Sequence, residues 1–284
     1  MIAITARAQS SALNRPLTSI RSVDFLNFTY EPSCISGTAM MPLHSTKITT
    51  MGGLYDHSRD PHVDIPVYFA VKDVIYGELR GDGTEQAIVL TGCNLGGTGY
   101  WTEALIFELR AGKPLEIESI GGGDRAMGGI KSIRVDGHLL KVAQQYGVAL
   151  CCADYIETTA YQMRGAKLAR FGISKRVAAR SGKPIKSLHF ERGTSSGIIS
   201  GQTDDDAIYE LRARAGQLLV IEQLGETTTT ADLGVFVMDP EGMTLKQDRD
   251  SKVRSIRLPS NGLYALVVSS NQSNVPFGFK VTIH

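Results

Sequence analysis

The sequence is poor in the features that identify nucleic-acid-binding and membrane proteins. Its 284 residues carry 30 basic and 29 acidic side chains, which leaves a net charge of +1. A nucleic-acid-binding protein normally shows a basic stripe and a high isoelectric point, so this balance argues against that class. No apolar run approaches the roughly 20 residues that a membrane-spanning helix needs. We therefore expect no nucleic-acid partner and no membrane span.

Catalytic motifs are scarce as well. There is no H-E-x-x-H zinc motif, and the six histidines are scattered without a standard ligand spacing. Residues 193–197 only superficially match a G-x-S-x-G nucleophile loop. The glycine-rich residues 121–129 do not lead from a strand into an amphipathic helix, as a nucleotide fingerprint requires. The sequence therefore predicts a protein that is not an enzyme.

Only four cysteines are present, all in the first 152 residues: Cys34, Cys93, Cys151 and Cys152. An even number in one region predicts two disulfides, for which four cysteines allow three pairings. Metal binding is disfavoured because there is no C-x-x-C pair. Adjacent cysteines could bond only through a strained ring, so we expect Cys151 and Cys152 to face opposite sides of a strand and to reach Cys34 and Cys93 in either order. Disulfides predict a periplasmic or secreted protein.

Residues 1–20 are polar and uneven, and we interpret them as a disordered tail or the remnant of a signal peptide. Ala6-Arg7-Ala8 fits the small-x-small pattern that precedes signal-peptidase cleavage. The usual basic region and long apolar stretch are missing. Either a signal peptide is clipped or the segment is a frayed tail.

Short apolar segments separated by glycine turns dominate the remaining chain. Their spacing of roughly 8–12 residues predicts antiparallel sheets, and Asp136-Gly137 is a strong hairpin signal. We therefore predict a mainly β protein, with an N-terminal antiparallel β domain over residues 21–171. Residues 172–186 are basic and almost without pattern, which is typical of a solvated linker. Residues 187–284 contain about eight short predicted strands, which indicates a small, jelly-roll-like β-sandwich.

Three segments of the second domain carry a family resemblance. They are HFERGTSSGIISGQ (189–202), YELRARAGQLLVIE (209–222) and LPSNGLYALVV (258–268). This pattern resembles the pre-peptidase C-terminal (PPC) type sandwich, and it is similar to bacterial inhibitors of g-type lysozyme. The most specific residues have structural reasons, because Gly216 permits a left-handed turn, Pro259 can start an edge strand and the Tyr264 hydroxyl can pin a loop.

The first domain resembles an uncharacterised bacterial exported family. The matching segments are SVDFLNFTY (22–30), VIYGELRGDGTEQAIVL (74–90), GGTGYWTEALIFELR (96–110), GGGDRAMGGI (121–130) and CCADYIETTAYQ (151–162). This resemblance implies an exported location and a β fold only, and it assigns neither the presence nor the absence of an activity.

Two acidic segments could bind calcium, the one cofactor that the sequence leaves open. Residues 78–86 are similar to D-x-N-x-D-G calcium loops and include Asp82, but Arg80 stands where a ligand is expected. A plain hairpin turn is the alternative. Asp204, Asp205 and Asp206 repel one another unless a cation or solvent screens them, so they form either a calcium site or a solvated turn.

Four further residues are candidates for ligand binding. Tyr100 and Trp101 are neighbours on a predicted strand, so only one of them can face the core. The other is then an exposed aromatic that could stack on a sugar or a partner protein. Asp124 and Arg125 could bind a polar ligand, although a salt-bridged turn is the favoured explanation.

The leading functional hypothesis is an exported, non-catalytic binding protein. The resemblance of residues 187–284 implies, in its most concrete form, an inhibitor of a cell-wall hydrolase, with exposed loops such as 225–232 or 269–276 making the contact. One alternative is a carbohydrate- or surface-binding accessory module. The other is a secreted hydrolase whose site lies in the N-terminal domain, where Glu103, Glu108, Glu116 and Glu118 could offer a carboxylate pair. Alternating glutamates on strands more simply mark a solvated face.

Overall fold

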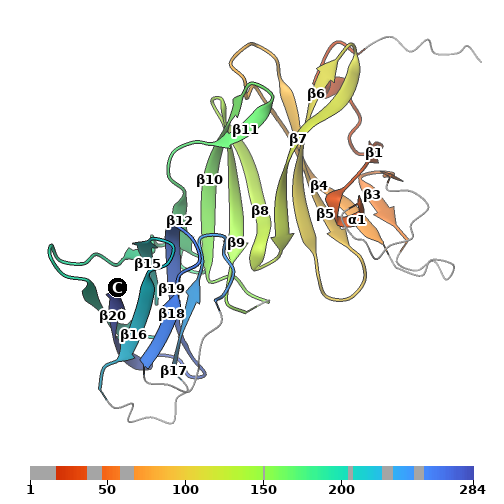
Figure 1. Ribbon diagram of the computed structural model, residues 1–284. Helices are drawn as coiled ribbons and strands as arrows, with labels where there is room; N and C mark the ends of the chain where they lie inside the picture. The colour runs from red at the N-terminus through yellow and green to blue at the C-terminus, as the bar shows by residue number, and fades with distance from the viewer. Residues whose placement is uncertain are drawn as a thin grey trace, which may run out of the picture.

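A computed structural model describes residues 17–36, 47–57, 67–149, 151–203, 207–225, 233–245 and 253–284. Nearly all of its regular structure is strand, so the predicted mainly β fold is confirmed. The strands form an N-terminal unit with two large sheets, followed by a C-terminal sandwich (Figure 1).

The N-terminal unit is built from two antiparallel sheets that pack face to face. Their facing side chains share one core, to which Ile88 and Ile106 contribute from the first sheet and Leu140 and Val142 from the second. The first sheet has the order β3 (Leu54–Asp56), β4 (Tyr68–Gly77), β5 (Gln86–Asn94), β6 (Trp101–Arg110), β7 (Lys113–Asp124). The second has the order β11 (Lys167–Arg170), β10 (Tyr155–Arg164), β9 (Leu139–Tyr146), β8 (Met127–Asp136), with β12 (Lys175–Ala178) also paired to β10.

The N-terminal segment covers the outer face of the first sheet. Phe25 and Tyr30 pack there against Phe69 and Phe107, with ring centroids 5.1 to 6.2 Å apart. Burial of these aromatic side chains explains why a segment with so little regular structure stays in place. Its short elements are η1 (Ile20–Ser22), β1 (Thr29–Tyr30), α1 (Ser33–Ser36) and β2 (Ile48–Thr49).

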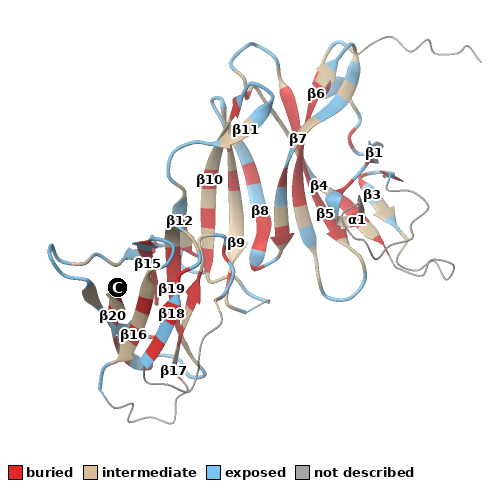
Figure 2. Ribbon diagram, in the orientation of Figure 1, coloured by how far each residue is buried: buried red, intermediate tan, exposed pale blue. Residues whose placement is uncertain are grey.

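The C-terminal unit is a sandwich of two four-stranded sheets. Leu211 and Leu266 of one sheet meet Leu219 and Phe279 of the other in a largely apolar core. Figure 2 shows buried positions along the strands of both units. The first sheet has the order β13 (Lys186–Ser187), β15 (Ile208–Ala213), β19 (Gly262–Ser270), β17 (Leu233–Met238). The second has the order β14 (Ser196–Gln202), β20 (Pro276–Ile283), β16 (Leu218–Gln223), β18 (Val253–Arg257).

A separate apolar cluster joins the two units. The outer face of the sheet that contains β15 and β19 packs against β10 and β12, and the cluster includes Tyr155, Ala178, Ile208, Ala265 and Val267. Residues 172–186, interpreted from the sequence as a linker, supply β12 to the N-terminal unit and lead into β13 of the sandwich. The domain boundaries themselves stay a prediction.

One buried ion pair of the N-terminal unit lies at this contact. The Arg176 Nε atom lies 2.6 Å from Glu157 Oε2, and both side chains are almost fully buried. Arg176 Nη1 also donates to the carbonyl oxygen of Leu263 in β19, at 2.9 Å. Arg176 therefore ties the N-terminal unit to the sandwich through one charged group.

Several turns have the geometry that their sequences predict. Gly137 and Gly165 close hairpins with φ of 58° and 63°, and Gly216 has φ of 80°. The Tyr264 hydroxyl donates to the carbonyl oxygen of Ser260 at 2.7 Å, so its predicted role in pinning a loop is confirmed. Pro259 does not start an edge strand, because it lies in the turn between β18 and β19.

The cysteine pairing differs from the expected one. Cys34 bonds to Cys93, which ties α1 to β5, and Cys151 bonds to its neighbour Cys152. The expectation assumed that Cys151 and Cys152 lie on a strand with alternating faces. They lie instead in a turn between β9 and β10, where nothing forces their side chains apart.

We predict that Arg176→Leu destabilises the protein by about 3–5 kcal/mol, because Glu157 would be left buried without its partner. The double variant Arg176→Leu/Glu157→Leu should recover much of this loss, since it removes both charges. Urea unfolding followed by circular dichroism measures both effects. A double variant no more stable than Arg176→Leu alone would contradict this explanation.

Candidate functional site: a polar cleft between the two units

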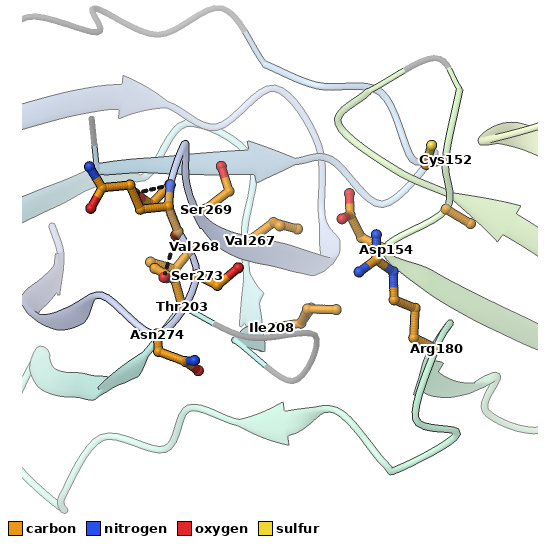
Figure 3. Close-up of a pocket in the computed structure, with 13 residues that line it drawn as sticks. Cys152, Asp154, Arg180, Thr203, Ile208, Val267, Val268, Ser269, Ser273 and Asn274 are labelled. Atoms are coloured by element: carbon orange, nitrogen blue, oxygen red, sulfur yellow. Dashed lines mark hydrogen bonds between the residues drawn. The ribbon is translucent and has the colours of Figure 1, made fainter. Parts of the chain in front are cut away.

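A cleft of about 440 Å³ lies at the edge of the contact between the two units (Figure 3). The N-terminal unit contributes the turn before β10 and residue 180. The sandwich contributes the end of β19 and the loop that follows it. The cleft floor is apolar, with Ile208 and Val267 buried, whereas its rim carries hydroxyl, amide and charged groups.

The loop after β19 is held by a single buried threonine. The Thr203 hydroxyl donates to the Gln272 carbonyl oxygen at 3.2 Å and accepts from the Val275 amide at 2.9 Å. The Thr203 backbone pairs with Asn274 and Val275 at 2.8 Å each. These four bonds fix the loop backbone while the side chains of Gln272, Ser273 and Asn274 stay exposed.

Asp154 and Arg180 form the charged part of the cleft. The Asp154 carboxylate accepts a hydrogen bond from the Val148 amide at 2.8 Å, and its backbone bonds to Tyr146 and Ala179. Burial raises the pKa of Asp154, and the nearby positive charge of Arg180 opposes that rise. Figure 3 shows the two side chains next to each other in the cleft. The site therefore presents a carboxylate and a guanidinium beside a row of neutral polar groups.

Sequence reasoning pointed to only part of this site. The predicted contact loop 269–276 does line the cleft. Cys152 lies there too, although it was singled out for its sulfur chemistry alone. Asp154, Arg180 and Thr203 were missed because each is an ordinary polar residue in its own segment, and only the packing of the two units brings them together.

The two candidate aromatic residues stand at the start of β6: Tyr100 directly precedes the strand and Trp101 is its first residue. Tyr100 covers Gly92 so closely that a Cβ atom there would approach its hydroxyl to 2.2 Å. Trp101 is the exposed one, with 49% of its surface accessible. Neither lies at the inter-unit cleft.

Asp124 and Arg125 form a salt-bridged turn. Asp124 Oδ1 accepts from the Tyr100 amide at 2.7 Å and from Arg125 Nε at 3.2 Å. The carboxylate therefore fixes the start of β6, which is a structural task.

The Asp82 carboxylate is engaged in a hydrogen bond within its own turn. It accepts from the Thr84 amide at 2.9 Å, and Arg80 pairs with Glu108 at 3.0 Å. Asp204, Asp205 and Asp206 lie outside the described residues. Within the part of the chain that the structure describes, no three His, Cys, Asp or Glu side chains come together as metal ligands.

The strand glutamates do not all mark a solvated face. Glu103 and Glu108 are buried, with 8% and 7% of their surfaces exposed, so that interpretation is wrong for these two. Glu116 keeps contact with solvent, yet the surrounding protein and the charges of Glu103 and Glu31 raise its pKa to about 7. The carboxylates of Glu103 and Glu31 thus lie close enough to perturb that of Glu116.

Among the described residues, no helix is long and apolar enough to cross a membrane.

No family model and no curated protein matches the chain. Among solved structures, the crystal structure of Aeromonas hydrophila PliG, a periplasmic lysozyme inhibitor of g-type lysozyme, is similar to this chain. The likeness covers 35% of this chain and 96% of the PliG chain, with 20% sequence identity and a TM-score of 0.31.

We predict that Glu116→Gln removes a pH-dependent loss of stability. Folding raises the pKa of Glu116 from 4.5 to about 7, so the folded state binds more protons between these values. The stability gained from its protonation is complete below pH 4.5 and disappears as the pH rises through 7. The variant should therefore melt at a higher temperature than the wild type above pH 7 and at the same temperature near pH 4.5.

Thermal unfolding across this range is the measurement, with Glu222→Gln on the sandwich as the matched control. A difference between Glu116→Gln and wild type that is the same at every pH would contradict the assignment.

Proposed function

We propose that this chain is a non-catalytic binding protein that acts outside the cytoplasm and holds a polar segment of another protein in the inter-unit cleft. The observation that carries the proposal is the loop that Thr203 fixes. It presents Gln272 and Ser273 to solvent on a backbone that is already ordered. A site ordered before binding loses less conformational entropy when the partner arrives.

The disulfide between Cys34 and Cys93 supports the compartment. Such bonds persist in oxidising environments, including the bacterial periplasm, and are rare in the cytosol. A periplasmic or secreted location is the specific form of the proposal.

The chemistry of the rim favours a protein partner. Hydroxyl and amide side chains from Ser269 to Asn274 can both donate and accept hydrogen bonds, as protein backbones require. Asp154 and Arg180 add one charge of each sign, which suits a neutral or mixed-charge segment. The buried Ile208 and Val267 offer a small apolar floor to an inserted side chain.

For the partner, we propose a cell-wall hydrolase of the lysozyme class. This choice rests on the sequence resemblance of residues 187–284 to inhibitors of g-type lysozyme. The predicted contact loop 269–276 lies at the rim of the cleft, where a protruding segment of a partner can reach it.

The test is inhibition of cell lysis by g-, c- and i-type lysozymes, together with direct binding by calorimetry. We expect the wild type to inhibit at least one class, and the double variant Gln272→Ala/Ser273→Ala to bind it about tenfold more weakly or worse. That loss corresponds to about 1.4 kcal/mol, the size of one or two lost hydrogen bonds.

Lys280→Ala is the matched control, because Lys280 is an exposed residue of β20 in the other sheet of the sandwich. No inhibition and no binding at micromolar concentrations of any of the three lysozymes would remove the hydrolase as partner. Inhibition that is unchanged in the double variant would exclude the cleft as the contact.

A further inference from the structure

A second hollow, of about 280 Å³, lies in the N-terminal unit beside α1. It is separate from the inter-unit cleft, and α1 lies on the side of the N-terminal unit away from the sandwich (Figure 1). Its volume lies just below the range of about 300–1,000 Å³ that small-molecule sites occupy. The size suits a single side chain rather than an extended ligand.

One wall of this hollow is apolar and aromatic. Trp101 pairs with Cys93 across β5 and β6, and the Cys34–Cys93 disulfide lies beside it. Leu95 completes this wall. Trp101 borders the hollow and is still 49% exposed, so a ligand can reach its side chain.

The hollow holds one charged side chain among its described lining residues. This is Glu103, which is 8% exposed and accepts a hydrogen bond from the Ser33 amide at 3.2 Å. Glu31 and Glu116 add negative charge nearby, and the charges of Glu103 and Glu31 help to raise the pKa of Glu116. No basic side chain lines the hollow in the described part of the chain.

We propose that this hollow binds a protonated amine or guanidinium, carried by a lysine or arginine side chain of a partner protein. A cation over an indole face is attracted by the ring quadrupole, and Trp is the best aromatic for this contact. The Glu103 carboxylate provides a charge-assisted acceptor.

Two lining hydroxyls, those of Thr91 and Thr102, are already engaged, which favours a cation over a sugar. The Thr91 hydroxyl donates to the Glu103 carbonyl oxygen at 3.1 Å, and the Thr102 hydroxyl accepts from the Ile130 amide at 2.6 Å. Both groups are thus engaged within the protein. A sugar needs donors as well as acceptors around its ring, whereas a cation needs only acceptors and the aromatic face.

This proposal does not depend on the function proposed for the inter-unit cleft. The two sites share no residues, so a lysozyme assay and the following test can fail separately.

Trp101 is the single tryptophan of the chain, so the indole N–H signal in a ¹H–¹⁵N NMR spectrum reports on this hollow alone. The probes are acetyl-Gly-Lys-Gly-amide and acetyl-Gly-Arg-Gly-amide, with acetyl-Gly-Gln-Gly-amide as the neutral control and chitotetraose as the sugar. We expect saturable shifts with the two cationic peptides only. Glu103→Gln should weaken their binding about tenfold while the glutamine still accepts from Ser33.

Glu222→Gln serves as the control for a general change in charge. Glu116→Gln removes a second negative charge near the hollow and should also weaken binding of the cationic peptides. Because Glu116 contacts solvent, this variant keeps the test decisive if Glu103→Gln does not fold. If chitotetraose shifted the Trp101 signal and neither cationic peptide did, the ligand would be a sugar and the proposed cation would be ruled out. Equal shifts with the glutamine peptide, or none with any probe, would overturn the proposal.

Discussion

The structure depends on one sheet of the sandwich being buried on both faces. One face of β13–β15–β19–β17 forms the sandwich core, and the other packs on the N-terminal unit. Without the N-terminal unit, apolar side chains of that second face such as Ile208 and Val267 would be exposed to water, so the contact stabilises the sandwich. Arg176 bonds across the contact, and at Gly242 a Cβ atom would come within 2.1 Å of the Tyr146 ring. The close fit leaves little freedom for the units to separate.

This contact also creates the proposed binding site. Asp154 and Arg180 come from one unit and Thr203 and the loop after β19 from the other, and the cleft exists only where they meet. The arrangement places ordered polar groups above an apolar floor. The hollow beside Trp101 depends on a different constraint, the Cys34–Cys93 bond that holds α1 against the first sheet. Two separate sites on one body would let the protein contact a partner at more than one point.

The sequence predicts the strands and turns well, because both have local causes. Alternating apolar residues define strands, and glycines such as Gly137 and Gly216 adopt the positive φ that their turns require. The relation between the units was not predictable in the same way. Arg176 lies in a basic segment typical of a solvated connector, and its burial depends on Glu157 and Leu263, which are distant in sequence. Glu103 follows a strand pattern typical of solvated residues, and only the cover from the N-terminal segment buries it.

The most direct test of the shared contact compares two unfolding curves of the same protein. Trp101 emission follows the N-terminal unit alone, because the sandwich contains no tryptophan. Far-ultraviolet circular dichroism follows the strands of both units. The account predicts that the two signals change together in a single thermal transition, as expected when the units unfold cooperatively. A circular dichroism curve with two steps, only one of which coincides with the Trp101 signal, would show that the sandwich folds without its neighbour and would contradict it.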